Sequence, residues 1–218
     1  MYIDSVKIDV NLDAVKTVCT ISTMQKKKTY HHGNLRTALM DAAIELLKNG
    51  DSSELSLRGV AKLAGVSHAA PAHHFNGKDG LLAAVAARGF VVFADYMTEE
   101  IQGLNEADHF NRIKGVCKGY LRFALNEQSL FDLILTVDKR FTWTDEVYAA
   151  SMRSQQILAR ACAPFASEKD GAIETLIWSM VHGYTALARS GHLLPEPEAD
   201  FATLVGMIDM LQLKTMQG

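Results

Sequence analysis

The sequence predicts an all-α fold in which a small N-terminal three-helix unit is joined by a long helix to a C-terminal helical bundle. Apolar residues recur at helical spacing over most of the chain, with little of the strict alternation that marks strands. The 218 residues include only four prolines, which leaves long uninterrupted segments. A content of 48% hydrophobic and 22% charged residues is typical of a soluble globular protein. This length suits a small module fused to a medium one.

Charge divides the chain into a basic and an acidic part. Residues 26–78 hold eight Lys and Arg against four Asp and Glu, a net charge of +4. Residues 79–218 hold twelve Lys and Arg against eighteen Asp and Glu, a net charge of -6. Residues 1–25 carry the remaining net charge of -1. A charge run by itself also fits a solvated face. The asymmetry nevertheless indicates that the first module meets a polyanion and the second does not.

Several classes of protein are excluded by what the chain contains. Cys19, Cys117 and Cys162 are widely separated and odd in number, so we expect buried thiols rather than a disulfide framework or a thiolate zinc site. No continuous apolar run approaches the roughly 18 to 20 residues that cross a bilayer. Residues 1–24 mix apolar residues with aspartates and do not resemble a signal peptide. We therefore expect a cytoplasmic protein with no membrane partner.

Capping signals outline three helices in the basic part. Asn34 and Gly50 bound the first, Ser56 caps the second, Gly65 ends it, and Ser67 offers a fresh N-cap for the third. These helices are expected at 35–49, 56–64 and 67–75. A connecting helix is expected at 79–103. Further helices are expected in the acidic part at 108–126, 129–138, 144–164, 168–190 and 199–214, with Pro164, Pro195 and Pro197 marking breaks.

The second and third helices have the features of a helix-turn-helix. Ala61 and Gly65, four residues apart, supply a small residue at the crossing and a residue that tolerates positive φ in the turn. Four apolar residues are placed to tie this pair to the first helix: Leu57, Val60, Val66 and Phe75. Such a scaffold can present the third helix to the major groove of DNA. An ordinary helical hairpin fits the same spacing, and the flanking charge favours DNA.

A basic arm precedes the first helix. It begins with Lys26, Lys27 and Lys28, and neither an acidic residue nor an apolar pattern follows before residue 34. Lysines in such an arm can neutralise phosphates or enter a minor groove. A solvated tail is the alternative. Met24 directly precedes the arm and is a candidate alternative start, with residues 1–25 as an N-terminal extension.

Five short motifs in order resemble the DNA-binding domain of the tetracycline-repressor (TetR) family. They are Tyr30-His31-His32-Gly33-Asn34-Leu35-Arg36, Leu57-Arg58-Gly59-Val60-Ala61, Ala64-Gly65-Val66-Ser67, His74-Phe75 and Lys78-Asp79-Gly80-Leu81-Leu82. The resemblance covers about residues 30 to 90. It implies a homodimer that binds a palindromic operator through residues 26–78 of each chain. It also implies that residues 79–218 form a domain for dimerisation and for binding a small-molecule effector. We expect no cofactor.

The resemblance also assigns expected DNA contacts. Ser56, Arg58 and Lys78 correspond to contacts with the DNA backbone, and His74 lies nearer the backbone than the bases. The residues expected to face the groove are Ser67, His68, Ala69, Ala70 and His73. Because the two alanines offer only apolar contacts, hydrogen-bonded readout would rest on Ser67, His68 and His73.

The chain departs from the family at two positions in the third helix. Ala72 stands where the family usually has a tyrosine that touches the DNA backbone, which puts one contact in doubt. Pro71 removes an amide donor near the helix start, where its loss is tolerable.

In the acidic part, Ile177-Trp178-Ser179-Met180-Val181-His182-Gly183-Tyr184 is similar to the Trp-His-Gly motif of one C-terminal domain type among these regulators, the WHG domain. Trp178 and His182, four apart, share a helix face. An aromatic and methionine-rich set is able to line an effector pocket, although core packing explains such residues equally well. The set is Phe93, Met97, Phe123, Phe131, Trp143, Tyr148, Met152, Trp178 and His182.

Apolar stripes on the last two helices suit either an intramolecular core or the four-helix dimer interface that the family implies. The candidate interface residues are Ile177, Met180, Gly183, Leu187, Phe201, Leu204, Val205 and Ile208.

Other functions find less support in the sequence. The adjacent pairs His31-His32 and His73-His74 diverge by about a hundred degrees on a helix, so neither can chelate a metal as an i, i+4 pair would. No nucleophile with its base, carboxylate pair or phosphate-binding glycine loop indicates an enzyme. An architectural DNA-binding protein would keep the helix-turn-helix but would not need the large acidic domain.

Overall fold

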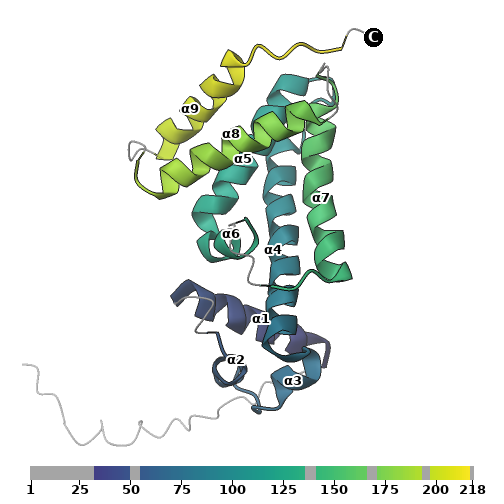
Figure 1. The fold of residues 1–218 in the computed structure, drawn as a ribbon, viewed down its shortest axis with the longest axis vertical. Helices are drawn as coiled ribbons and strands as arrows, with labels where there is room; N and C mark the ends of the chain where they lie inside the picture. The colour runs from purple at the N-terminus through teal and green to yellow at the C-terminus, as the bar shows by residue number, and fades with distance from the viewer. Residues whose placement is uncertain (1–31, 50–54, 136–140, 166–170, 193–196, 217–218) are drawn as a thin grey trace, which may run out of the picture. The chain divides into compact units, whose positions relative to one another are not determined.

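Helix α4 (Gly77–Ile101) is the element against which most other helices pack in the computed structural model of the chain (Figure 1). The structure describes residues 32–49, 55–135, 141–165, 171–192 and 197–216. Within these residues it consists of helices and loops, with one isolated bridge between Phe165 and Thr215. The predicted all-α class is confirmed.

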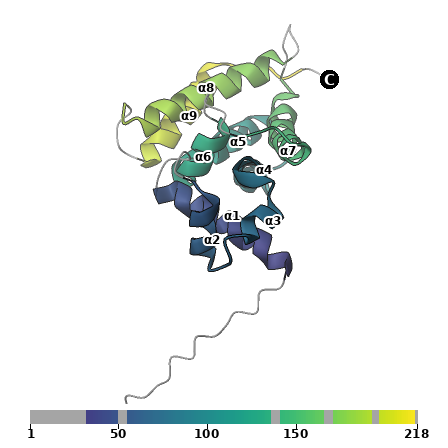
Figure 2. The same ribbon diagram turned by 60° about the horizontal axis from the view of Figure 1, so that its bottom comes forward.

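The N-terminal unit contains α1 (His32–Asn49), α2 (Leu57–Ala64) and α3 (Ala70–His74), which gather at the start of α4 (Figure 2). Its core is formed by buried side chains of all four helices or their ends, among them Leu39, Val60, Phe75 and Leu81. Leu57 and Val66 pack against this core as partly buried residues. The apolar positions predicted to join the three helices therefore do so.

Gly65 makes the turn of the helix-turn-helix. It has φ 68° and ψ 33°, in the left-handed region that glycine adopts without a steric penalty. Its N–H donates to the carbonyl of Lys62, and the N–H of Val66 donates to the carbonyl of Ala61 at 3.0 Å. These two bonds form a Schellman motif, which ends α2 and turns the chain toward α3.

Two predicted helix starts are wrong. Helix α1 already begins at His32, so Asn34 lies inside it rather than capping it. Helix α3 begins at Ala70, and Ser67 does not cap it, because the N–H of Ala70 donates to the carbonyl of Ser67 in a tight turn. Pro71 has no N–H to continue a helical ladder back to Ser67, so the i to i-4 bonds begin with His73, which donates to Ala69.

Replacing Ser56 with alanine is expected to lower the free energy of unfolding by about 1 kcal/mol. The Ser56 hydroxyl oxygen accepts a hydrogen bond from the N–H of Gly59 at 3.1 Å and caps α2. Ser67→Ala is the matched control, and chemical denaturation should show a change of less than about 0.5 kcal/mol for it. Equal losses in the two variants would contradict this assignment of the caps.

The C-terminal part adds α5 (His109–Asn126), α6 (Gln128–Leu135), α7 (Asp145–Cys162), α8 (Ala172–Arg189) and α9 (Pro197–Met210). All five predicted helices are present, and their ends differ by a few residues. Thr144 caps α7 by accepting from the N–H of Val147. Pro197 is the first residue of α9 rather than a break before it, since proline is well suited to a first helical turn.

Helix α4 is long and apolar enough to cross a membrane by composition alone. However, 67% of its most apolar window is buried, and α5 and α7 cover it along much of its length (Figure 1). This burial is the pattern of the central helix of a folded core.

Candidate functional site

The predicted groove-facing residues lie on the outer surface of the turn and of α3. Ser67, His68, Ala69 and His73 are exposed, and Ala70 is half-buried. On the opposite side of the same short helix, Pro71 and Phe75 are buried against the core. The helix is thus anchored by one face and leaves the other free for a macromolecular partner.

The residues expected at the DNA backbone flank this surface in the chain. Ser56 and Arg58 are exposed at the start of α2, while His74 and Lys78 are half-buried. The His74 ring lies 6.5 Å from the ring of Phe75. Ala72, at the position of the family's tyrosine, is exposed. Lys26, Lys27 and Lys28 lie outside the described residues.

A cavity lies among α4, α5, α7 and α8, with a volume of about 20 Å³. This volume is close to the space that one water molecule needs. Three residues predicted to contact a ligand, Phe93, Met97 and Trp178, are in its wall. The full lining is Phe93, Met97, Val116, Cys117, Tyr120, Ser154, Gln155, Leu158, Ile177, Trp178 and Val181.

The cavity residues follow a regular spacing in the sequence that was not among the predictions. Each of α5, α7 and α8 contributes residues at i, i+1 and i+4, as in Val116, Cys117 and Tyr120. Such triplets share one face of a helix. This spacing can be found in the sequence. However, it occurs on any helix face that points into a protein, so it does not by itself distinguish a helix that lines a cavity from one in a filled core.

Six residues predicted to contact a ligand lie outside this cavity. Phe123 and Phe131 are buried in an aromatic core beside Phe93, with the Phe93 and Phe123 rings 5.1 Å apart. Trp143 packs against Phe90 and Tyr148 near the start of α7. Tyr148 and Met152 are 56% and 46% exposed, and His182 contacts Tyr120 from outside the cavity wall.

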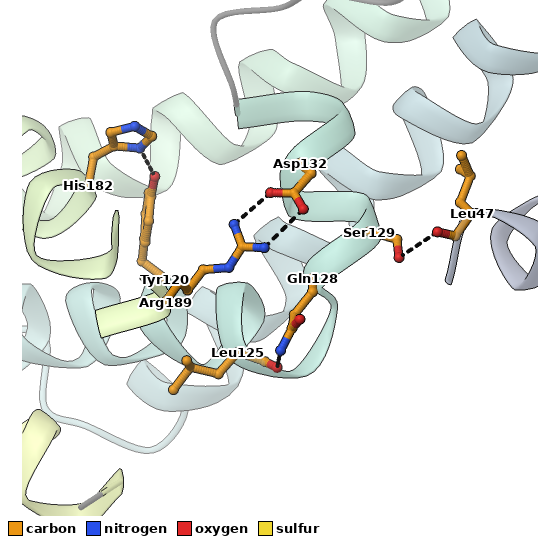
Figure 3. A network of polar contacts seen from close by, with 8 residues as sticks. All are labelled: Leu47, Tyr120, Leu125, Gln128, Ser129, Asp132, His182 and Arg189. Atoms are coloured by element: carbon orange, nitrogen blue, oxygen red, sulfur yellow. Dashed lines mark hydrogen bonds and ion pairs between the residues drawn. The ribbon is translucent and has the colours of Figure 1, made fainter. Parts of the chain in front are cut away.

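Tyr120 and His182 form a polar pair between α5 and α8 (Figure 3). The Tyr120 hydroxyl oxygen lies 2.7 Å from His182 Nδ1. Burial raises the pKa of Tyr120, so the phenol beside the imidazole stays protonated. Of the two residues predicted to share a helix face, Trp178 lines the cavity and His182 contacts Tyr120 of α5.

Helix α6 is tied on one side to α8 and on the other to α1 (Figure 3). Arg189 forms a two-pronged ion pair with Asp132, at 2.6 and 2.9 Å, and its guanidinium lies 4.7 Å from the centre of the Phe131 ring. The Ser129 hydroxyl donates to the carbonyl of Leu47 near the C-terminus of α1 at 3.2 Å. None of these contacts is predictable from local sequence patterns, because they join residues far apart in the chain.

Two further ion pairs join the N-terminal helices to the rest of the molecule. Arg36 of α1 pairs with Glu146 of α7 at 2.9 Å, and Arg88 of α4 pairs with Asp41 of α1 at 2.6 Å. All four side chains are at least one-third exposed, so each pair contributes little to stability. Both pairs link α1 to a neighbouring helix, one to α7 and the other to α4.

Cys117 and Cys162 are buried, as predicted for these two cysteines. Burial raises the pKa of each thiol to about 12, so both are protonated and unreactive at neutral pH. Cys19 lies outside the described residues. Within the described part of the chain, no three His, Cys, Asp or Glu side chains gather in an arrangement that could hold a metal ion.

The predicted dimer residues fall into two groups. Ile177, Leu204 and Ile208 are buried inside the single chain, where they have no surface to offer a partner subunit. Gly183 and Leu187 are exposed on α8, while Met180, Val205 and Phe201 are half-buried. Phe201 is covered by Lys118, whose ammonium lies 5.0 Å from the ring centre. Any contact with a second subunit would use the exposed and half-buried group.

Comparison with protein families gives two matches. Residues 39–85 match the family of bacterial regulatory proteins called tetR, and residues 113–211 match the tetracyclin repressor-like C-terminal domain. The first match contains the helix-turn-helix. The second contains Trp178, His182 and Gly183 and three of the four helices that line the cavity. Comparison with curated protein sequences gave no match.

Solved structures share the fold over most of the chain. A protein of unknown function from Rhodococcus sp. RHA1 is 27% identical, with a TM-score of 0.71 over 84% of this chain and 96% of that one. A TetR family transcription regulator from Marinobacter aquaeolei VT8 is 15% identical, with a TM-score of 0.62 over 84% and 97%. The regulator FadR from Bacillus subtilis, solved in complex with stearoyl-CoA, is 14% identical, with a TM-score of 0.62 over 83% and 99%.

The two family matches lie in the expected order, and the fold carries a helix-turn-helix at one end of α4 and a cavity further along it. The chain belongs to the tetracycline-repressor (TetR) family of transcriptional regulators.

Proposed function

We propose that the protein is a cytoplasmic repressor that binds a palindromic operator as a homodimer and is released by a small-molecule effector. Residues 26–78 form the DNA-binding domain, with Lys26, Lys27 and Lys28 as a basic arm. Residues 79–218 bind the effector and form the dimer.

The observation that best supports this proposal is that α4 contributes both to the core of the N-terminal unit and to the wall of the cavity. Its first turns supply Leu81, Leu82 and Val85 to the core shared with α1 to α3. Two to four turns further along, Phe93 and Met97 form part of the cavity wall. A ligand larger than one water must displace such side chains and press on α4, which would move the helix-turn-helix.

This coupling can control DNA binding because a dimer reads two half-sites at once. The separation of its recognition helices must match the helical repeat of DNA, about 34 Å per turn. A small movement of α4 in each subunit would change that separation and lower affinity. The complex of Bacillus subtilis FadR with stearoyl-CoA supports the expectation that a protein of this fold can bind a molecule with a long acyl chain.

His73→Ala is expected to weaken operator binding about tenfold, because each lost base contact removes about 1 to 3 kcal/mol of discrimination. His73 is exposed on the outer face of α3, so its removal should not disturb the core. His192→Ala is the matched control, since this exposed histidine lies beyond the end of α8, where its ring bonds to nearby Ser190. Fluorescence anisotropy with duplexes from DNA flanking the gene measures both, at several salt concentrations.

Three outcomes would contradict the proposal in different ways. Weak, sequence-independent binding unaffected by His73→Ala would favour an architectural DNA-binding protein. Tight operator binding by a monomer would remove the dimer from the mechanism. Absence of binding even at low salt would contradict the assigned DNA surface and reopen the enzyme alternative.

A further inference from the structure

The wall of the cavity contains no charged side chain. Its eleven residues include no Asp, Glu, Lys, Arg or His. Eight of them are buried, and these include the aromatic ring of Phe93 and the aliphatic chains of Ile177 and Val181. An ionised group placed among them would lose its hydration without gaining a counter-ion, which is strongly unfavourable.

The few polar groups inside the wall are already engaged. The Ser154 hydroxyl donates to the carbonyl of Ser151 at 2.7 Å, and the Tyr120 hydroxyl is paired with His182. The raised pKa of Cys117 keeps its thiol neutral. The interior therefore offers a ligand mainly apolar contact.

The cavity opens between α7 and α8. Among its lining residues, Gln155 and Trp178 are exposed, and Leu158 of α7 is half-buried. Trp178 has 38% of its surface exposed. A ligand with a single polar group would place that group here, where the Gln155 amide can both donate and accept hydrogen bonds and water is within reach.

We propose that the effector is an uncharged, largely apolar molecule whose one polar group stays at the mouth beside Gln155 and Trp178. The proposal rests on the proposed function of the cavity as the effector site. It excludes ligands that must bury a carboxylate, sulfonate or phosphate, and it makes Gln155 the residue that sets selectivity for the polar end.

The test compares 1-alkanols of four to ten carbons with carboxylates of the same length at pH 8, where the carboxylates are ionised. In a Trp143→Phe variant, the fluorescence of Trp178 reports binding. In the protein without substitutions, the shift in thermal unfolding temperature reports it. Alkanol affinity is expected to rise with chain length. Each carboxylate should bind at least about tenfold more weakly than its alkanol.

Gln155→Arg places a cation at the mouth and is expected to bring carboxylate affinity to within about threefold of alkanol affinity or to reverse the order. Gln156→Arg is the matched control, because Gln156 is the next exposed residue on α7 and does not line the cavity. It should leave the preference for alkanols unchanged.

Three results would overturn the inference: carboxylates that bind as tightly as alkanols, alkanols that change neither fluorescence nor unfolding temperature, or equal effects of the two arginine variants. Release of operator DNA is measured separately by anisotropy. If alkanols bind with the expected selectivity but leave the operator bound, the effector-release function fails while the assignment of ligand class stands.

Discussion

Replacing Gly119 with alanine is expected to destabilise the fold by about 3 kcal/mol or more. Helix α5 crosses α4 so closely here that a Cβ on Gly119 would lie 2.5 Å from both Met97 Cα and the Tyr96 carbonyl oxygen. These are backbone atoms, which cannot rotate away as a side chain could. Accommodating one methyl group requires α5 to move off α4. The free energy of unfolding from urea denaturation measures the loss.

Two other glycines provide comparisons for the Gly119→Ala variant. A Cβ on Gly115 would lie 2.9 Å from the Glu100 carbonyl oxygen and from Ile101 Cγ2, one a backbone atom and one a movable side-chain atom. Gly115→Ala should therefore cost less than Gly119→Ala. On α4 itself, Gly80 has its nearest neighbour at an ordinary 3.5 Å, and Gly80→Ala should be neutral or stabilising by up to about 1 kcal/mol. A Gly119→Ala protein as stable as the Gly80→Ala protein would rule out the close crossing.

The crossing also borders the cavity that we propose as the effector site. Val116, Cys117 and Tyr120 of the same α5 segment, with Met97 of α4, line the cavity. A displaced α5 would widen the space between them. A Gly119→Ala protein that remains folded at low temperature is thus expected to bind 1-alkanols with altered affinity.

Periodicity predicts the helices well because burial repeats along each of them. In α1, Leu39, Ala43 and Leu47 recur at helical spacing and are buried, while Leu35 and Leu46 are partly buried, and Gly65 makes the turn that its lack of a side chain favours. Helix ends are predicted less well, since several residues can serve as caps and tertiary contacts choose among them. Ser56 and Ser67 have the same chemistry, yet only Ser56 caps a helix.

The cavity could be predicted only in part. The sequence indicates which face of a helix points inward, but it does not indicate which residues of other helices pack against that face. Tyr120 and Phe123 are three residues apart on α5 and are both buried. Only Tyr120 reaches the cavity, while Phe123 packs against Phe93 and Tyr96. The close approach at Gly115 and Gly119 was not predicted. The two glycines are four residues apart, but without knowledge of the partner helix this spacing does not indicate where α5 meets α4.

A stripe of four residues along α8 is the basis of the prediction about the dimer interface. Leu176 and Leu187 are 43% and 49% exposed, and Met180 and Gly183 lie between them at spacings of four, three and four residues. Nothing lies within 4 Å of a Cβ built on Gly183, so a helix of a second subunit has room to approach the backbone there. The core residues Ile177, Val181 and Tyr184 lie on the neighbouring face of α8, about a hundred degrees around the helix from this stripe.

Gly183→Arg is expected to convert the proposed dimer into a monomer and to weaken operator binding by about a hundredfold or more. A long, charged side chain at the centre of the stripe would have to be buried without a partner. Without the dimer each half-site is bound alone, which forfeits the factor of about 10² to 10⁴ that joined binding modules gain. Analytical ultracentrifugation measures the mass, and anisotropy at nanomolar protein measures the affinity.

Ala159→Arg is the control for this substitution, because it places the same side chain at an exposed position on α7. It should leave both the mass and the operator affinity unchanged. If Gly183→Arg remains a dimer with full affinity, the α8 stripe is not the interface, and the half-buried Val205 and Gly206 of α9 become the next positions to test. If it becomes a monomer yet binds DNA as tightly as before, the stripe is the interface but operator recognition does not require two joined subunits.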